Sequence, residues 1–348
     1  MLETVTIDGL PPIKSISIDV SAEEAARSAR VDLVIVGSGI PASVGQNVKV
    51  LATGDPMLTG YVRDINTGYT EQDRFLTCSL ISKTVDYIEC SAEHDTGEIL
   101  NKSLDEIARE LDSLGIGVKT DGSRFPKELR HKLMIGEAPF SSIERRARGR
   151  GVLIHDTAEG QIMLATKPAG MHKGTLKRGV NILTDGATAS FTEKGRYSDI
   201  KVRGQATEGT DKQQLRPQTL VRDGGILRRR PLIIAHEGEA TIDRMKKRAA
   251  WQARRAAGMS VTASIPVTGW RDDGGQIWQP NWLVQVDDDW LGIEGLMIIK
   301  SVSFNYGDKT TATLSLADPR ALGGDNPRGK SASGYAAPAA SDAEYEEQ

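Results

Sequence analysis

The chain has few of the residues that carry out chemistry and no apolar run long enough to cross a membrane. Its 348 residues include two cysteines, Cys78 and Cys90, and five histidines. Two cysteines without metal-site spacing are too few for a disulfide scaffold, so both are expected to be buried structural thiols. The N-terminus, MLETVTIDGLPP, lacks the basic and apolar regions of a signal peptide. The sequence therefore predicts a protein that is made in a cytoplasm and stays there.

Catalytic signatures are missing as well. The sequence contains no G-x-S-x-G, no H-E-x-x-H and no signature of a cysteine nucleophile. His94-Asp95 and His155-Asp156 are adjacent pairs, but neighbours in a strand point to opposite faces and rarely act as one acid/base unit. We therefore expect no catalytic residue, no cofactor and no metal site.

Charge is balanced along most of the chain. The formal net charge is −3 and 26% of the residues are charged, which is typical of a globular protein and not of a basic nucleic-acid-binding domain. Residues 216–255 are the exception, with eleven Lys and Arg residues against four acidic ones. Nucleic acid or an acidic partner could use this excess. In RMKKRAAWQARRAAG, however, the charges spread around a helix, which favours a solvated or inter-subunit face.

A phosphate-binding pattern occurs near the C-terminus. Residues 324–331, GDNPRGKS, match G-x-x-x-x-G-K-S, and an NTPase would use Lys330. Such a loop needs a helix after it, whose N-terminus meets the phosphates. Gly334 and Pro338 follow instead, in a stretch without an apolar stripe. The context therefore argues against nucleotide binding.

A dinucleotide-binding pattern fails the same test. Gly37, Gly39 and Ala42 have G-x-G-x-x-A spacing after the strand pattern VDLVIV. Pro41 and then alternating valines follow, which predict a turn and a strand instead of a helix. The glycines are therefore interpreted as part of a hairpin turn.

Strand patterns dominate both ends of the chain. The first 90 residues and residues 259–316 alternate apolar and polar positions between Gly, Pro and Asp turns. The polar segment ATEGTDKQQLRPQ is long enough for a mobile loop, and the Gly, Pro, Ala and Ser content beyond Asp318 predicts a disordered tail. The chain is thus expected to be mainly β.

Helix signals gather between these ends. Ser103 with Glu106 forms a capping box, and Ser141 with Glu144 forms another, so two helices are expected in residues 97–167, followed by the hairpin GVLIHDTAEGQIMLAT. A third helix is expected over residues 240–258. The apolar face of the first helix consists of Leu104, Ile107, Ala108, Leu111 and Leu114.

The two strand-rich ends resemble each other. Their corresponding apolar positions lie 236 or 237 residues apart: Val50 and Val286, Val62 and Ile299, Ile65 and Val302, Leu80 and Leu316. A duplication explains this constant spacing, and chance similarity between two sets of alternating strands is the alternative. If duplication holds, one chain carries two similar β-domains.

Four of the five tryptophans lie in GWRDDGGQIWQPNWLVQVDDDW: Trp270, Trp278, Trp282 and Trp290. They could form a platform for stacking sugars, but bulky aromatics in a strand-rich segment usually fill a core. A glycosidase would also need Asp272, Asp273 and Asp287 to converge on its substrate. The run Asp287-Asp288-Asp289 lacks the spacing of a calcium loop and is interpreted as a solvated turn.

Three stretches resemble a known family. GEAPFSSIERRARGRGVLIHDTAEGQIMLAT, AAWQARRAAGMSVTASIPVTGWRDDGGQIWQPNWLVQV and QNVKVLATGDPMLTGYVRDI are similar to baseplate hub proteins of contractile-tailed phages, the Mu-like tail protein P and late-control D family. The resemblance covers most of the chain and carries no catalytic signature. Its structural motif residues in the last β-block are Gly269, Trp270, Trp278, Pro280 and Asn281.

The resemblance implies a fold that is mainly β with an α/β insertion, in which one chain holds two tube-type antiparallel β-barrel domains. The implied division is residues 1–95 for the first tube-type domain, 96–168 for the α/β subdomain, 169–238 for a β-rich connection, 239–318 for the second tube-type domain with a leading helix, and 319–348 for a disordered tail.

The implied function is structural and not enzymatic. A homotrimeric ring would adapt the hexameric tail tube to a trimeric central spike, contact other baseplate proteins and pass DNA without reading its sequence. Such a hub belongs to the virion and is assembled in the host cytoplasm. The alternative is a glycan-binding or glycan-cleaving tail protein that uses the tryptophan cluster.

Overall fold

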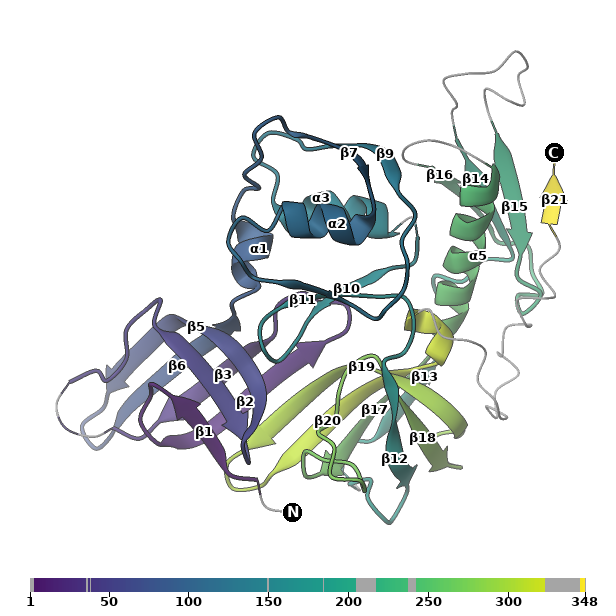
Figure 1. Cartoon of the computed structure of the whole chain (residues 1–348). Coiled ribbons are helices and arrows are strands. Elements are labelled where there is room, and N and C mark those ends of the chain that lie inside the picture. Colours follow the sequence, from purple (N-terminus) through teal and green to yellow (C-terminus); the bar gives the residue numbers. More distant parts are fainter. Residues whose placement is uncertain are drawn as a thin grey trace.

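The computed structural model describes residues 3–35, 37, 39–148, 150–183, 185–204, 217–236, 242–322 and 345–347 (Figure 1). The strands are β1 (Val5–Asp8), β2 (Ile13–Ser21), β3 (Ser28–Leu33), β4 (Asn47–Ala52), β5 (Asp55–Tyr69), β6 (Arg74–Ser82), β7 (Glu98–Lys102), β8 (Val118–Thr120), β9 (Glu128–Lys132), β10 (Leu153–Asp156), β11 (Ile162–Ala165), β12 (Gly170–Lys177), β13 (Thr188–Phe191), β14 (Asp199–Arg203), β15 (Gln218–Arg222), β16 (Pro231–Ala235), β17 (Val261–Thr268), β18 (Trp282–Asp288), β19 (Ile293–Tyr306), β20 (Thr311–Ala317) and β21 (Tyr345–Glu347). The helices are α1 (Val85–Glu89), α2 (Leu104–Glu110), α3 (Pro139–Arg148), α5 (Ile242–Gly258) and the 3-10 helix η1 (Pro319–Leu322). The protein is mainly β, as the sequence predicts.

One large sheet unites the two ends of the chain. β1 to β6 form a first unit with the strand order β1-β4-β5-β6-β3-β2, and β12, β13 and β17 to β20 form a second unit with the order β12-β18-β19-β20-β17-β13. β2 pairs with β19 and thereby joins the units. Apolar side chains of both units belong to one continuous core cluster. Figure 1 shows the first unit at the left and the second at the lower right.

The two units repeat the same pairing register. Val62 on β5 lies opposite Leu80 on β6, and Ile299 on β19 lies opposite Leu316 on β20. The ladder of each pair is interrupted at the same place, directly after Val62 and directly after Ile299. A bulge is set by local backbone geometry, so its repetition shows that the two units match position by position.

The match extends to the neighbouring strands. Ala29 on β3 lies opposite Leu80, and Ala263 on β17 lies opposite Leu316. The units differ at one edge, where β1 runs antiparallel to β4 but β12 runs parallel to β18. The spacing of 236 or 237 residues in the sequence therefore corresponds to a repeated strand order. An isolated bridge of Ile182 with Arg178 and another with Val267 bring the end of β12 close to β17.

A small α/β subdomain lies above the large sheet. Its core combines α1, α2 and α3 with the strands β8, β10 and β11, and β7 pairs with β9 beside them. The capping box of Ser103 and Glu106 starts α2 as predicted. The prediction for the next helix was wrong by three residues, since a cap at Ser141 would start the helix at residue 142 whereas α3 begins at Pro139, whose fixed φ suits a first helical turn. Leu114 was also assigned wrongly to the buried face, because α2 ends at Glu110 and leaves Leu114 exposed.

A separate four-stranded sheet carries the third helix. β16, β14, β15 and β21 form this sheet, and α5 packs on it through Met245 and Ala249. The helix predicted for residues 240–258 is therefore present, but it covers β14 and β15 as well as η1 instead of lying only beside the last strands. β12 and β13, from the predicted connecting segment, belong to the second unit.

The remaining sequence expectations have mixed outcomes. No helix follows Gly37, Gly39 and Ala42; a turn leads directly into β4, as predicted. The phosphate-loop motif at 324–331, most of the predicted mobile loop and most of the predicted disordered tail lie outside the described residues. Cys78 is buried, but Cys90 is exposed, so the prediction of a second buried thiol was wrong. Cys90 directly follows the last residue of α1 and lies at the surface. The sequence around Cys90 does not indicate this position.

Candidate assembly site

The predicted motif residues Gly269 and Trp270 hold a turn against the core of the second unit. Gly269 has φ +79°, which favours glycine, and its N–H donates to the carbonyl of Thr310 at 3.0 Å. Trp270 is buried, and its indole Nε1 donates to the carbonyl of Thr311 at 3.0 Å. Its ring meets that of Phe304 edge-on, with centroids 5.2 Å apart. Trp270 therefore fixes the hairpin between β19 and β20.

Trp278 belongs to a second buried group, which no pattern in the sequence indicates. His172 on β12 lies between the rings of Trp278 and Trp282, with centroids 4.7 and 4.9 Å away. Its Nδ1 lies 2.9 Å from Oδ2 of Asp272, and its Nε2 accepts the backbone N–H of Gln279 at 3.1 Å. Because Nε2 is an acceptor, the imidazole is neutral and Nδ1 carries its proton.

Burial explains the protonation state of this group. Burial lowers the pKa of His172, and the hydrogen bond with Asp272 only partly opposes that effect. Burial would raise the pKa of Asp272, but hydrogen bonds from the N–H groups of Lys173, Gln276 and Gly274 and from His172 lower it. The pair therefore fastens β12 to the loop before β18. His172 and Asp272 are 100 residues apart in the chain, so no local sequence pattern predicts their contact.

Pro280 and Asn281 set the start of β18. Both are buried, and Asn281 has φ +61°. Its N–H donates to the carbonyl of Ile299 at 2.8 Å, and its Nδ2 donates to that of Lys167 at 3.0 Å. In the first unit Gly45 takes this place, with φ +80° and an N–H donated to Val62. Both residue types tolerate the left-handed region, so the repeat keeps the conformation with different side chains.

The two units meet at a fully buried junction. β2 pairs with residues 301–306 of β19, where Val20 lies opposite Val302 and Ile18 opposite Phe304. These four side chains are at most 3% exposed. The first half of β19, by contrast, pairs with β18. On this edge, the first half of the long strand β19 thus pairs with β18 of its own unit, and the second half pairs with β2 of the first unit.

An ionic contact reinforces this junction. Arg271 in the second unit lies 2.7 Å from Oε1 of Glu3 and 2.7 Å from Oδ2 of Asp55, both in the first unit. Burial alone would raise the pKa of Glu3, but hydrogen bonds from Arg271 and Thr53 hold it below its ordinary value. The carboxylate of Glu3 is therefore ionised, and Arg271 links the two units.

The α/β subdomain is fastened by a buried ion pair. Nε of Arg27, in the first unit, lies 3.0 Å from Oδ2 of Asp156 on β10, and both side chains are buried. Nη1 of Arg27 also donates to the carbonyl of Met57 at 2.7 Å. A buried pair of this kind is valuable mainly for the orientation that it imposes.

Two family models match this chain. The second domain of baseplate hub proteins like gp44 matches residues 84–166, and the fourth domain of the Mu phage baseplate assembly protein GpP matches residues 241–324. The baseplate hub protein gp44 of Escherichia phage Mu is 28% identical over 281 residues, which is 76% of this chain and 73% of that protein. The chain is therefore similar to Mu-like baseplate hub proteins over most of its length, and this similarity supports a structural role in a phage tail baseplate.

Solved structures agree with this assignment. The 43 kDa tail protein of prophage MuSo2 from Shewanella oneidensis superposes with a TM-score of 0.80 at 28% identity, covering 92% of this chain and 99% of that one. A tail protein from Neisseria meningitidis MC58 gives a TM-score of 0.77 at 18% identity, with the same coverage, and supports the fold alone.

The four clustered tryptophans do not form a sugar-stacking surface. Trp270 and Trp278 are buried, Trp282 is half-buried, and only Trp290 is largely exposed, at 82%. Asp272 is engaged with His172 and backbone N–H groups, so its oxygens do not face a substrate. The core-filling interpretation is therefore correct for Trp270 and Trp278 and wrong for Trp290, and the buried rings give the glycan alternative no platform.

The acidic run at the end of β18 leads into a turn. Asp288 is buried, against the prediction of a solvated run, because its Oδ1 accepts the N–H groups of Trp290 and Leu291. Asp287 pairs with Lys177 at 2.8 Å.

Within the described part of the chain, no group of three potential ligands could hold a metal ion. No described helix is long and apolar enough to cross a membrane.

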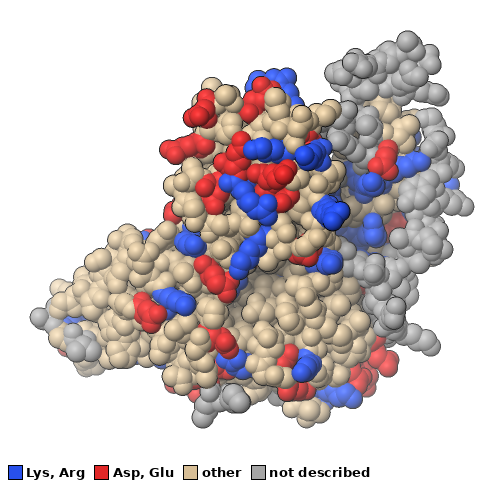
Figure 2. Space-filling view, viewed as in Figure 1, with Lys and Arg blue, Asp and Glu red and all other residues tan. Residues whose placement is uncertain are grey.

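The face of the protein shown in Figure 2 has mixed charge. In Figure 2, Lys, Arg, Asp and Glu side chains intermingle over the α/β subdomain, and fewer lie over the large sheet. The basic helix α5 is partly compensated, since Lys247 lies 2.8 Å from Asp243 and Arg255 pairs with Glu23 of the first unit. This arrangement supports a solvated or inter-subunit face.

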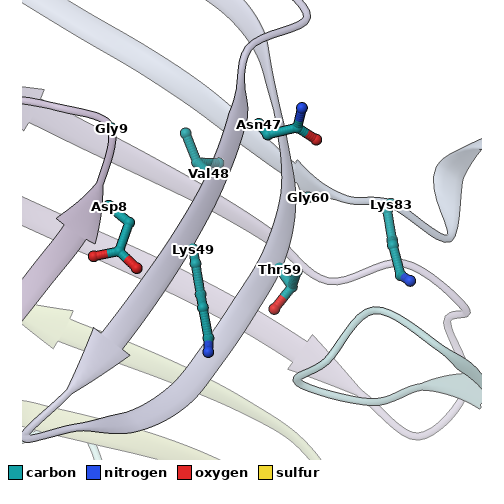
Figure 3. A pocket seen from close by; sticks show the side chains of 8 residues that line it. All are labelled: Asp8, Gly9, Asn47, Val48, Lys49, Thr59, Gly60 and Lys83. Atoms are coloured by element: carbon teal, nitrogen blue, oxygen red, sulfur yellow. The ribbon is translucent and has the colours of Figure 1, made fainter.

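An open hollow of about 340 Å³ lies over β1, β4 and β5 (Figure 3). Lys49, Lys83, Asp8 and Thr59 are among its lining residues. Asp8 and Lys49 are register partners with opposite charges. The lining holds two basic residues against one acidic residue, and these do not form the acid/base grouping of a reaction site.

Proposed function

We propose that this protein is the central hub of a contractile tail baseplate and acts as a homotrimeric ring. The observation that carries the proposal is the repeated unit, with the same strand order, register and bulge. Three chains with two such units present six similar units around an axis. The ring would match a hexameric tail tube on one side and keep three-fold symmetry for a trimeric spike on the other.

The proposed domain division follows this arrangement. Residues 1–95 and 239–318 would form two tube-type β-domains, closed as barrels in the assembly, with residues 96–168 as the α/β subdomain. From residues 169–238, β12 and β13 would complete the second barrel. Residues 319–348 would form a tail. The α/β subdomain and the sheet under α5 would project from the ring towards other baseplate proteins, and DNA would pass through the channel without sequence recognition. Assembly would take place in the host cytoplasm.

Native mass spectrometry of the purified chain tests the ring. We expect a species of three 37.6 kDa chains. Electron-microscopic class averages of that species should show six similar β-lobes with three-fold symmetry. A chain that stays monomeric at all concentrations, both alone and with a tail tube protein, would contradict the proposal. Binding on a glycan array that Trp290→Ala abolishes would instead favour the glycan alternative.

A further inference from the structure

Half of strand β5 has no partner on one side among the described residues. On its β4 side, hydrogen bonding of β5 ends at Val62, and residues 64–69 pair only with β6. In the second unit, the equivalent residues are 301–306 of β19, which pair with β2. The first unit therefore has an acceptor edge like the one that the second unit has already filled.

Strand β13 is the matching free edge of the second unit. It ends the path of the large sheet and, among the described residues, pairs only with β17. Ile18 on β2 lies opposite Ala29, and Ala189 on β13 lies opposite Ala263, the repeat equivalent of Ala29. β13 therefore corresponds to the part of β2 that fills the edge of β19.

Exposure agrees with an unfilled junction. In the filled junction, the facing side chains Val302 and Val20 are 0% and 3% exposed. Their equivalents are Ile65, which is half-buried, and Phe191, which is 36% exposed. Tyr69, the equivalent of a half-buried tyrosine in β19, is 85% exposed. Large apolar side chains at a free strand edge need a cover, because the edge otherwise invites unspecific pairing.

We infer that β13 of one chain pairs antiparallel with residues 64–69 of β5 in a second copy of the chain, in the register of the β2–β19 junction. Carrying that register over places Ile65 opposite Phe191, Asn66 opposite Ser190, Thr67 opposite Ala189 and Gly68 opposite Thr188. This inference rests on the proposed trimer and names the strands that close it.

The positions of the two edges suit a ring. The β5–β6 hairpin extends at one end of the large sheet and β13 lies at the other (Figure 1). Each chain therefore offers one acceptor and one donor, so the contact is head-to-tail. Such contacts form a closed ring when their rotation closes. The same geometry inside and between chains makes the six junctions alike.

Cysteine cross-linking tests the register. The equivalents of Asn66 and Ser190 are Ser303 and Asp19, whose side-chain oxygens lie 2.5 Å apart, so cysteines at these two sites should come within disulfide reach. Two single variants, N66C and S190C, are made in a C90S background and mixed. Because each chain has one introduced thiol, a disulfide between residues 66 and 190 must join two chains.

The matched control is N66C mixed with T188C. Thr188 lies on the same face of β13, two residues away, and the diagonal separation of about 7–8 Å exceeds disulfide reach. After oxidation, we expect the 66–190 disulfide, confirmed by peptide mapping, in at least tenfold excess over the 66–188 disulfide. The native mass of the wild-type protein is measured in parallel.

The outcomes separate this inference from the proposed function. A three-chain species without the 66–190 disulfide overturns the edge pairing and leaves the trimeric hub intact. A monomer without any cross-link overturns both. A 66–190 disulfide within assemblies that do not close at three chains supports the pairing and contradicts the trimer.

Discussion

Replacing Phe304 by alanine tests how firmly the two units are joined. The side chain is 1% exposed, lies opposite Ile18 across the β2–β19 junction and packs against Trp270. Truncating a buried aromatic residue removes its transfer free energy and leaves a cavity, which together lower the free energy of unfolding by about 3–5 kcal/mol. Because domains are stable by only about 5–15 kcal/mol, this loss is large.

The repeat supplies a matched control for this variant. Thr67 occupies the equivalent position in the first unit, where it is exposed. In the unassembled chain, at concentrations below trimer formation, Thr67→Ala should therefore change the free energy of unfolding by no more than about 0.5 kcal/mol. Urea unfolding followed by tryptophan fluorescence, at equal protein concentration, gives both values. The midpoint for Phe304→Ala should fall while the slope stays unchanged, since one core spans both units.

Two results would refute this reasoning. A loss below about 1 kcal/mol for Phe304→Ala would mean that the junction collapses around the missing ring or contributes little. Two separate unfolding transitions in the wild-type protein would mean that the units are independent and that their continuous core is not cooperative.

Three further predictions concern single side chains. Trp278→Ala should lower the free energy of unfolding by about 3–5 kcal/mol, and the trimer content with it; wild-type stability and trimer content would count against this expectation. The pKa of His172 is lowered from 6.5 in the folded state, so on acidification the unfolded chain takes up the proton first and the free energy of unfolding should fall below about pH 6.5. Urea titrations over a pH series should show a smaller fall for His172→Gln. An equal pH dependence of the free energy of unfolding in both proteins would contradict the assignment. Gly60→Ala should lower the melting temperature clearly, since an added Cβ would lie 1.8 Å from the carbonyl oxygen of Ile81, whereas Gly39→Ala meets open space and should melt like the wild type.

Local signals in the sequence predicted local structure well. The capping box at Ser103 depends on residues three positions apart, and α2 starts there. Alternating apolar residues predicted the strands because a strand has one buried face. The predicted start of α3 was wrong because Ser141 and Glu144 match a capping pattern but lie inside the helix. The helix begins at Pro139, whose fixed φ suits a first helical turn.

Contacts between distant segments were beyond local patterns. His172 finds Asp272 across 100 residues, and Arg27 finds Asp156 across 129. The sequence position of a single histidine or arginine does not predict its contact partner, because the packing of the strands determines which side chains meet. The same holds for the placement of α5, whose apolar face could have covered any sheet.

The sequence by itself determined the strand-rich ends, the capped helix and the constant spacing between two sets of apolar positions, because each follows from the periodicity of one segment. Only the tertiary structure decided that β12 and β13 complete the second unit, that β2 fills the edge of β19, and that no described segment of the chain fills the equivalent edge of β5. Strand pairing depends on which backbone edges meet in space, and periodicity along the chain does not encode that choice.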